Sequence, residues 1–84
     1  MYKIVVSPKA KNQLRKISKR LYRDSIAQAI EELKFNPFVG KPLARELTGK
    51  YSYRIGTYRV IYKIRHKDNI VEVILAGHRA TIYN

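Results

Sequence analysis

RIGTYRVIY, residues 54–62, is the stretch that decides the fold of this 84-residue chain. It predicts two neighbouring strands, 51–55 and 58–65, joined by a tight turn. Apolar residues alternate along the second strand and give it one apolar face: Tyr58, Val60, Tyr62 and Ile64. Arg54 and Arg59 flank the turn, where a purely structural hairpin needs no pair of guanidiniums. Because guanidiniums bind phosphate in bidentate fashion and stay charged at any accessible pH, the two arginines are candidate phosphate ligands.

The rest of the chain predicts a small set of further elements. They are a strand over 2–6, a helix over 8–17 opened by Ser7-Pro8, a helix over about 20–35 stopped by Asn36-Pro37, and a last strand over 70–77. The order β-α-α-β-β-β predicts one α+β domain over residues 1–84, an antiparallel sheet with a helical hairpin packed on one face. A long connection, 36–49, precedes the central strands, and we expect Phe38 and Leu43 to hold it against the core.

The charge of the chain is strongly positive and unevenly placed. Lys and Arg number 18 against six Asp and Glu, which gives a net charge of +12. Residues 1–23 carry eight of these cations and residues 47–67 carry six, with no acid in either segment. We therefore expect a polyanionic partner, such as nucleic acid, the ribosome or an acidic protein segment. A merely solubilising surface is the alternative, although self-repulsion is costly in so small a domain.

Composition and motifs exclude several other classes. The chain has no cysteine, hence no disulfide or thiol nucleophile, which fits a cytoplasmic protein. The apolar run before Ser7-Pro8 is too short for a signal-peptide core, and none approaches membrane-spanning length, so we expect no membrane partner. We find no HxxxH pattern, no paired carboxylates and no Gly-rich phosphate loop. We therefore expect neither a metal nor a small-molecule cofactor.

Five residues form the candidate catalytic set: Arg54, Arg59, His78, Arg79 and Tyr83. Arg59 alternates with the apolar residues of its strand and so points to the face left open by the helices, with Arg54 as its companion. Arg79 is a second phosphate ligand or a stabiliser of the leaving oxygen. His78 is a general acid or base, or else a packing residue. Tyr83 stacks on a base or donates a proton, or else anchors the C-terminal tail.

A set of this kind suits the cleavage of RNA without a metal. The 2′-hydroxyl of RNA is a built-in nucleophile, so the protein need only orient it, assist its deprotonation, neutralise the phosphorane and protonate the 5′-oxygen. DNA lacks this hydroxyl. RNA is therefore the natural substrate of such a site.

The same residues resemble a family, the RelE/ParE superfamily of bacterial and archaeal toxins. Its members commonly carry Arg-x-Gly-x-Tyr-Arg, two apolar residues and Tyr, matched here by residues 54–62, and a late Gly-(Lys/His)-Arg, matched by residues 77–79. The resemblance implies a RelE-like, microbial ribonuclease-like fold. It also implies a toxin of a type II toxin–antitoxin system, on the mRNA interferase branch. Such a toxin is a metal-independent endoribonuclease that cuts mRNA on the ribosome, inhibits translation and is neutralised by a small acidic antitoxin.

The resemblance assigns roles by motif and leaves the general base open. Arg54 stands where RelE-type enzymes have a catalytic Lys or Arg, Arg59 and Arg79 match phosphate-binding arginines, and Tyr83 roughly matches a tail Tyr. Ser52 replaces a second basic residue of some relatives, and the spacing of Arg79 and Tyr83 also differs. A ParE-like toxin that poisons DNA gyrase and a non-catalytic RNA- or ribosome-binding module are the alternatives. The three arginines favour the ribonuclease, since a gyrase binder needs no phosphate clamp.

Overall fold

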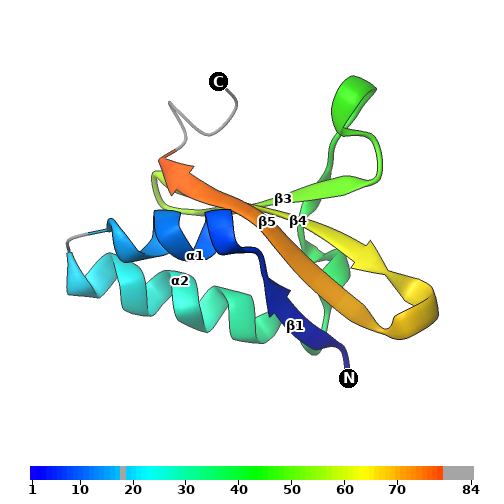
Figure 1. Cartoon of the computed structure of the whole chain (residues 1–84), viewed down its shortest axis with the longest axis horizontal. Coiled ribbons are helices and arrows are strands. Elements are labelled where there is room, and N and C mark those ends of the chain that lie inside the picture. Colours follow the sequence, from blue (N-terminus) through cyan, green and yellow to red (C-terminus); the bar gives the residue numbers. More distant parts are fainter. Residues whose placement is uncertain (18, 79–84) are drawn as a thin grey trace.

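The elements follow one another in the predicted order, with one short strand added (Figure 1). The computed structural model describes residues 1–17 and 19–78. The regular elements are β1 (Lys3–Val6), α1 (Pro8–Arg15), α2 (Arg20–Glu32), β2 (Lys41–Pro42), β3 (Lys50–Ile55), β4 (Tyr58–Arg65) and β5 (Ile70–His78). Three single 3-10 turns lie between them: η1 (Pro37–Val39), η2 (Arg45–Leu47) and η3 (His66–Asp68). The α+β fold is thereby confirmed.

The strands form one five-stranded sheet in the order β1-β5-β4-β3-β2. β5, β4, β3 and β2 are antiparallel to their neighbours, but β1 pairs in parallel with β5. The expectation of a wholly antiparallel sheet is therefore wrong at this edge. The two helices carry the chain away from β1 before the remaining strands form, and such a crossover allows parallel pairing where a tight hairpin does not.

Local sequence explains where α1 begins. The Ser7 hydroxyl accepts a hydrogen bond from the Ala10 N–H at 3.1 Å and donates one to the Ile74 carbonyl of β5 at 2.9 Å. Pro8 occupies the first helical turn, where its missing N–H costs nothing. α1 ends at Arg15, two residues before the predicted boundary. Among the described residues neither helix is long and apolar enough to cross a membrane.

The core lies between the helices and one face of the sheet. Its buried members are Ala10, Ile17, Ile26, Ile30, Leu33, Val60, Tyr62, Ile64, Val71, Val73 and Ala76. In β4 these are the alternate positions that the sequence pattern placed on the apolar face, because successive strand side chains point to opposite faces. The intervening residues of β4 face away from the helices, and Ile61 among them is buried as well.

Tyr62 ties the connection after α2 to this core. Its ring is fully buried, and its hydroxyl donates to the Pro37 carbonyl at 2.6 Å and accepts from the Gly40 N–H at 3.0 Å. Phe38 lies between these two anchors and is 54% exposed. The expectation that Phe38 holds the connection against the core is therefore wrong, since two backbone hydrogen bonds to Tyr62 hold it instead.

Candidate functional site

Arg54 and Arg59 lie directly opposite one another across the β3–β4 ladder, at the hairpin end. Their neighbours Tyr53 and Val60 pack on the core side, so alternation puts both arginines on the helix-free face. Arg54 is exposed, and its Nε–H donates to the Gly56 carbonyl at 3.5 Å, whereas Arg59 is half-buried. Two guanidiniums thus stand side by side on a hairpin, as the sequence predicted.

Cross-strand charge pairing does not stabilise the arginine pair. Like charges directly opposite each other in an antiparallel pair are destabilising, by up to about 1 kcal/mol. Among the described strands the only acid is Glu72, which lies opposite Lys63 and hydrogen-bonds Arg65 at 3.0 Å. No described strand places an acid opposite Arg54 or Arg59, and two guanidiniums side by side suit an anionic ligand such as phosphate.

Gly77 keeps the space beside the pair open. It is the cross-strand partner of Arg59 on β5, so the row across the three strands reads Arg54, Arg59, Gly77. A Cβ atom added at Gly77 would meet no heavy atom within 4 Å. The bulge of the sheet lies at Ile61/Tyr62 and not at Gly77. Gly77 therefore leaves room in this row beside Arg59.

His78 belongs to the other face of the sheet. It lies opposite Tyr58, and the two rings meet edge to face with centroids 5.8 Å apart and planes at 77°. Tyr58 packs against the core and also contacts the Tyr22 ring of α2, at 5.4 Å. The structure therefore brings Arg54 and Arg59 together but places His78 across the sheet from them. Arg79 and Tyr83 lie outside the described residues.

A second like-charged pair extends the basic face along the sheet. Lys50 and Lys63 lie opposite each other on the same face as the arginines, about 13 Å further along the strands. Lys41 of the edge strand β2 pairs with Ser52, whose side chain points to this face as well. Reasoning from the sequence favours phosphate contacts and a solvated surface equally for Lys41 and Lys50, and it passes over Lys63. Lys63 lies four residues after Arg59, and this even spacing in a strand indicates that both side chains point to the same face.

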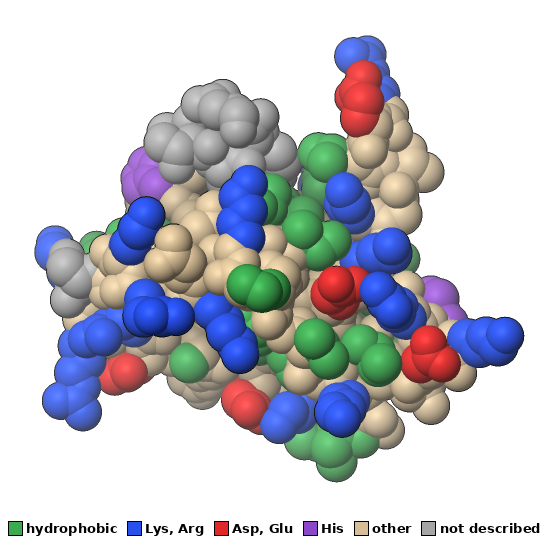
Figure 2. All heavy atoms as spheres, viewed as in Figure 1, with side chains coloured by type: hydrophobic (Ala, Val, Ile, Leu, Met, Phe, Trp, Pro, Cys, Tyr) green, Lys and Arg blue, Asp and Glu red, His purple; other side chains and the backbone are tan. Residues whose placement is uncertain are grey.

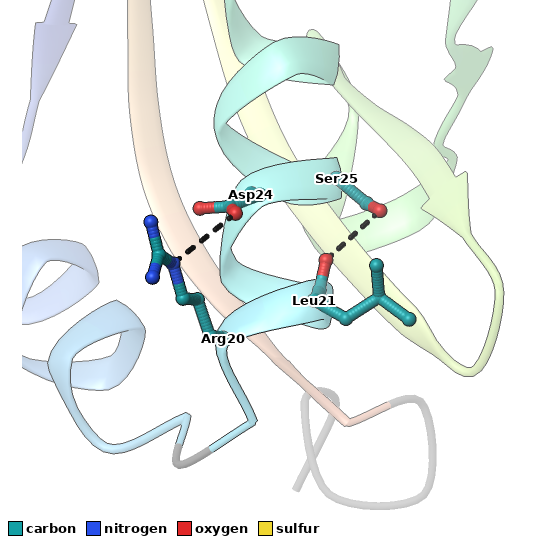
Figure 3. Close-up of polar contacts among 4 residues, drawn as sticks. All are labelled: Arg20, Leu21, Asp24 and Ser25. Atoms are coloured by element: carbon teal, nitrogen blue, oxygen red, sulfur yellow. Dashed lines mark hydrogen bonds and ion pairs between the residues drawn. The ribbon is translucent and has the colours of Figure 1, made fainter.

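The helix side of the molecule is also basic and little neutralised. Figure 2 shows Lys and Arg spread widely over the visible face, with few acids between them. On α2, Asp24 approaches the Arg20 Nε at 3.8 Å, and the Ser25 hydroxyl donates to the Leu21 carbonyl at 3.0 Å (Figure 3). The Arg20 and Asp24 side chains are 87% and 70% exposed, and such a pair contributes little. The surface charge thus remains available to a partner.

A groove of about 640 Å³ opens between β1 and the two helices. Its apolar lining is Ile4, Val6, Leu14, Ala27 and Ile30, and its charged lining is Lys11, Arg15, Arg23, Lys34 and Glu31. Glu31 is already engaged by Lys34 at 2.8 Å. The groove therefore combines apolar residues with a net basic rim, which suits the apolar face of an acidic amphipathic segment.

Comparison with known proteins shows that this chain is similar to toxins. Residues 4–83 match the family described as the ParE toxin of type II toxin–antitoxin systems, parDE. The chain is 37% identical to Toxin RelG of Mycobacterium tuberculosis, over 98% of this chain and 95% of that one. A chain of the M. tuberculosis RelBE2 toxin–antitoxin complex superposes with a TM-score of 0.85 at 34% identity, over 93% of this chain and 98% of that one. The intact E. coli RelBE complex, at 20% identity, 93% and 96% coverage and a TM-score of 0.79, shares the fold.

Proposed function

Because the chain belongs to the RelE/ParE family of type II toxin–antitoxin toxins, we propose that it cleaves mRNA on the ribosome, in the cytoplasm. The observation that carries this proposal is the pair of facing guanidiniums, Arg54 and Arg59, on the helix-free face of the sheet. The 2′-oxygen attacks the adjacent phosphorus, the P–O5′ bond breaks, and the products carry a 2′,3′-cyclic phosphate and a 5′-hydroxyl. The 2′-proton leaves and the 5′-oxygen gains one, so the step needs no co-reactant.

The role of the arginines is to neutralise charge on the phosphorane. The non-bridging oxygens gain negative charge as the fifth bond forms, and two fixed guanidiniums stabilise that charge more than the ground state. The open space over Gly77 admits the phosphate beside Arg59. His78 packs on Tyr58 in this scheme and positions the end of β5. Arg79 and Tyr83 remain candidates for the leaving oxygen and for base stacking.

Arg54→Gln and Arg59→Gln test this role in a translating extract. Primer extension on a translated message should map cuts for the wild type, and each variant should cut about 10²–10³ times more slowly. Lys16→Gln is the matched control, because it removes an exposed cation from the helix side and should only weaken encounter. An equal, modest loss in all three variants would show that binding charge, and not a phosphate site, explains the activity.

One observation favours a second function. The family match carries the ParE description, and the notable alternative for such a fold is poisoning of DNA gyrase. A gyrase poison would leave the message intact and trap broken DNA on purified gyrase. The arginine pair, which a gyrase binder does not need, supports the ribonuclease.

We further propose that an acidic, partly helical antitoxin occupies the groove between β1 and the helices. The groove offers apolar contacts and a basic rim, and related toxins have been solved with an antitoxin. Ala27→Glu places a carboxylate on the groove wall and should abolish co-purification with the protein encoded beside this chain. Gln28→Glu makes the same charge change one residue later, outside the groove lining, and should leave co-purification intact. Loss of binding in both variants would point to charge alone.

A further inference from the structure

Phe38 and His66 form a stacked ring pair on the surface. Phe38 belongs to η1 and His66 opens η3, and their ring centroids lie 5.6 Å apart with planes inclined by only 16°. At this centroid distance the two nearly parallel rings are offset from each other, and 54% of Phe38 stays exposed. About half of the Phe38 surface is therefore open to solvent and available for stacking.

The ring pair is held rigidly. The Tyr62 hydroxyl bonds the backbone on both sides of Phe38, at the Pro37 carbonyl and the Gly40 N–H. The Phe38 N–H donates to the Asn36 side-chain oxygen at 3.3 Å. A loop fixed at three points loses little conformational entropy when its exposed ring is covered, and this favours binding.

The chain on either side of Phe38 is basic. Residues 33–45 contain Lys34, Lys41 and Arg45 and no acid. Lys67 follows His66, and Asp68 is the acid of η3. An exposed aromatic face among cations is the usual arrangement for a stacked nucleobase, since bases stack on the ring while cations meet the phosphates.

We propose that the Phe38–His66 pair is a stacking platform for an unpaired base of ribosomal RNA. The choice of the ribosome rests on the proposed function. Phe38 and its exposed neighbour Val39 offer far less than the roughly 800 Å² per partner of a stable protein interface, whereas one base needs only one ring face. An mRNA strand bound at Arg54 and Arg59 does not easily reach the Phe38–His66 pair. From Arg59 to His66 the chain advances about 23 Å, and the loop meets the sheet at Tyr62, on the face opposite the arginines.

Substitution of Phe38 separates stacking from apolar contact. Phe38→Leu keeps apolar bulk without a π face, Phe38→Trp keeps the face, and Phe35→Ala is the control at an exposed Phe three residues earlier. Binding to purified ribosomes is measured at raised salt, where electrostatic attraction is screened. Phe38→Leu should weaken binding about 5- to 150-fold, the range of one stacked base, while Phe38→Trp and Phe35→Ala should bind as the wild type does. Because Phe38 is exposed, none of these changes threatens folding.

Several outcomes decide the matter. If Phe38→Leu bound ribosomes with wild-type affinity, the stacking platform would be overturned. It would also be overturned if Phe38→Leu lost antitoxin binding but kept ribosome binding, because the surface would then bind a protein. If the wild type bound ribosomes without cutting mRNA, the proposed reaction would fail. A Phe38-dependent affinity in that case would still support the platform.

Discussion

Tyr62→Phe removes the hydroxyl that bonds the connection between α2 and β2 at two points. The ring and its burial are retained, so the variant isolates two hydrogen bonds, to the Pro37 carbonyl at 2.6 Å and from the Gly40 N–H at 3.0 Å. Pro37 and Gly40 are buried, and a buried polar group left without its partner costs about 1–3 kcal/mol. We therefore expect the free energy of unfolding to fall by about 2–5 kcal/mol, and Tm to fall by about 10–30 °C in a domain of this size.

The same variant should change the response to alkali. Burial raises the pKa of Tyr62 from its ordinary value of 10.0 to about 12. Because the folded-state pKa is the higher one, the stability held by the neutral hydroxyl is complete below pH 10 and is lost as the pH rises towards 12. Two pH units correspond to a loss on the order of 3 kcal/mol in the wild type, and Phe has no such group to titrate. The difference between the two proteins should therefore shrink above pH 10.

Urea unfolding followed by circular dichroism measures both effects, at neutral pH and in steps above pH 10. Tyr53→Phe is the control, since its hydroxyl reaches Glu32 at 3.1 Å at an exposed position and should contribute far less. Two results would contradict the role of these hydrogen bonds. One is a free energy of unfolding of Tyr62→Phe within about 0.5 kcal/mol of the wild-type value at neutral pH. The other is a loss of stability above pH 10 as large in Tyr62→Phe as in the wild type.

Three other substitutions each test one local feature of the structure. Gly40→Ala drives a methyl group into the Tyr62 hydroxyl and should cost about 1–3 kcal/mol in thermal unfolding, and an unchanged Tm would contradict that contact. Ser7→Ala removes the cap of α1 and its bond to β5, and should lower the free energy of urea unfolding by about 1–2 kcal/mol, whereas Ser7→Thr should keep most of it. Gly77→Val fills open space beside Arg59, so Tm should stay within a few degrees while mRNA cleavage in a translating extract falls sharply; retained cleavage would place the phosphate elsewhere.

Local sequence determined the elements and the faces of the central hairpin. The alternation in β4 is set by strand geometry alone, so it sorted Val60 and Tyr62 to the core and Arg59 to the other side before any tertiary contact was known. Gly56, with a φ of 61°, supplies the turn conformation that other residues adopt only with strain. The register that follows sets Arg54 opposite Arg59, so the arginine pair was predictable.

What only the tertiary structure decided concerns residues whose partners are distant in sequence. The parallel pairing of β1 with β5 joins residues more than sixty positions apart, and no local pattern encodes it. The face of His78 depended on its register with Tyr58, and a shift of one residue would have turned it towards the arginines. Phe38 looked like a core residue by its type, but its exposure was settled by Tyr62, more than twenty residues later, which fixes the backbone around it. Local sequence sets φ, ψ and the alternation of side chains, whereas long-range packing chooses which of those side chains are covered.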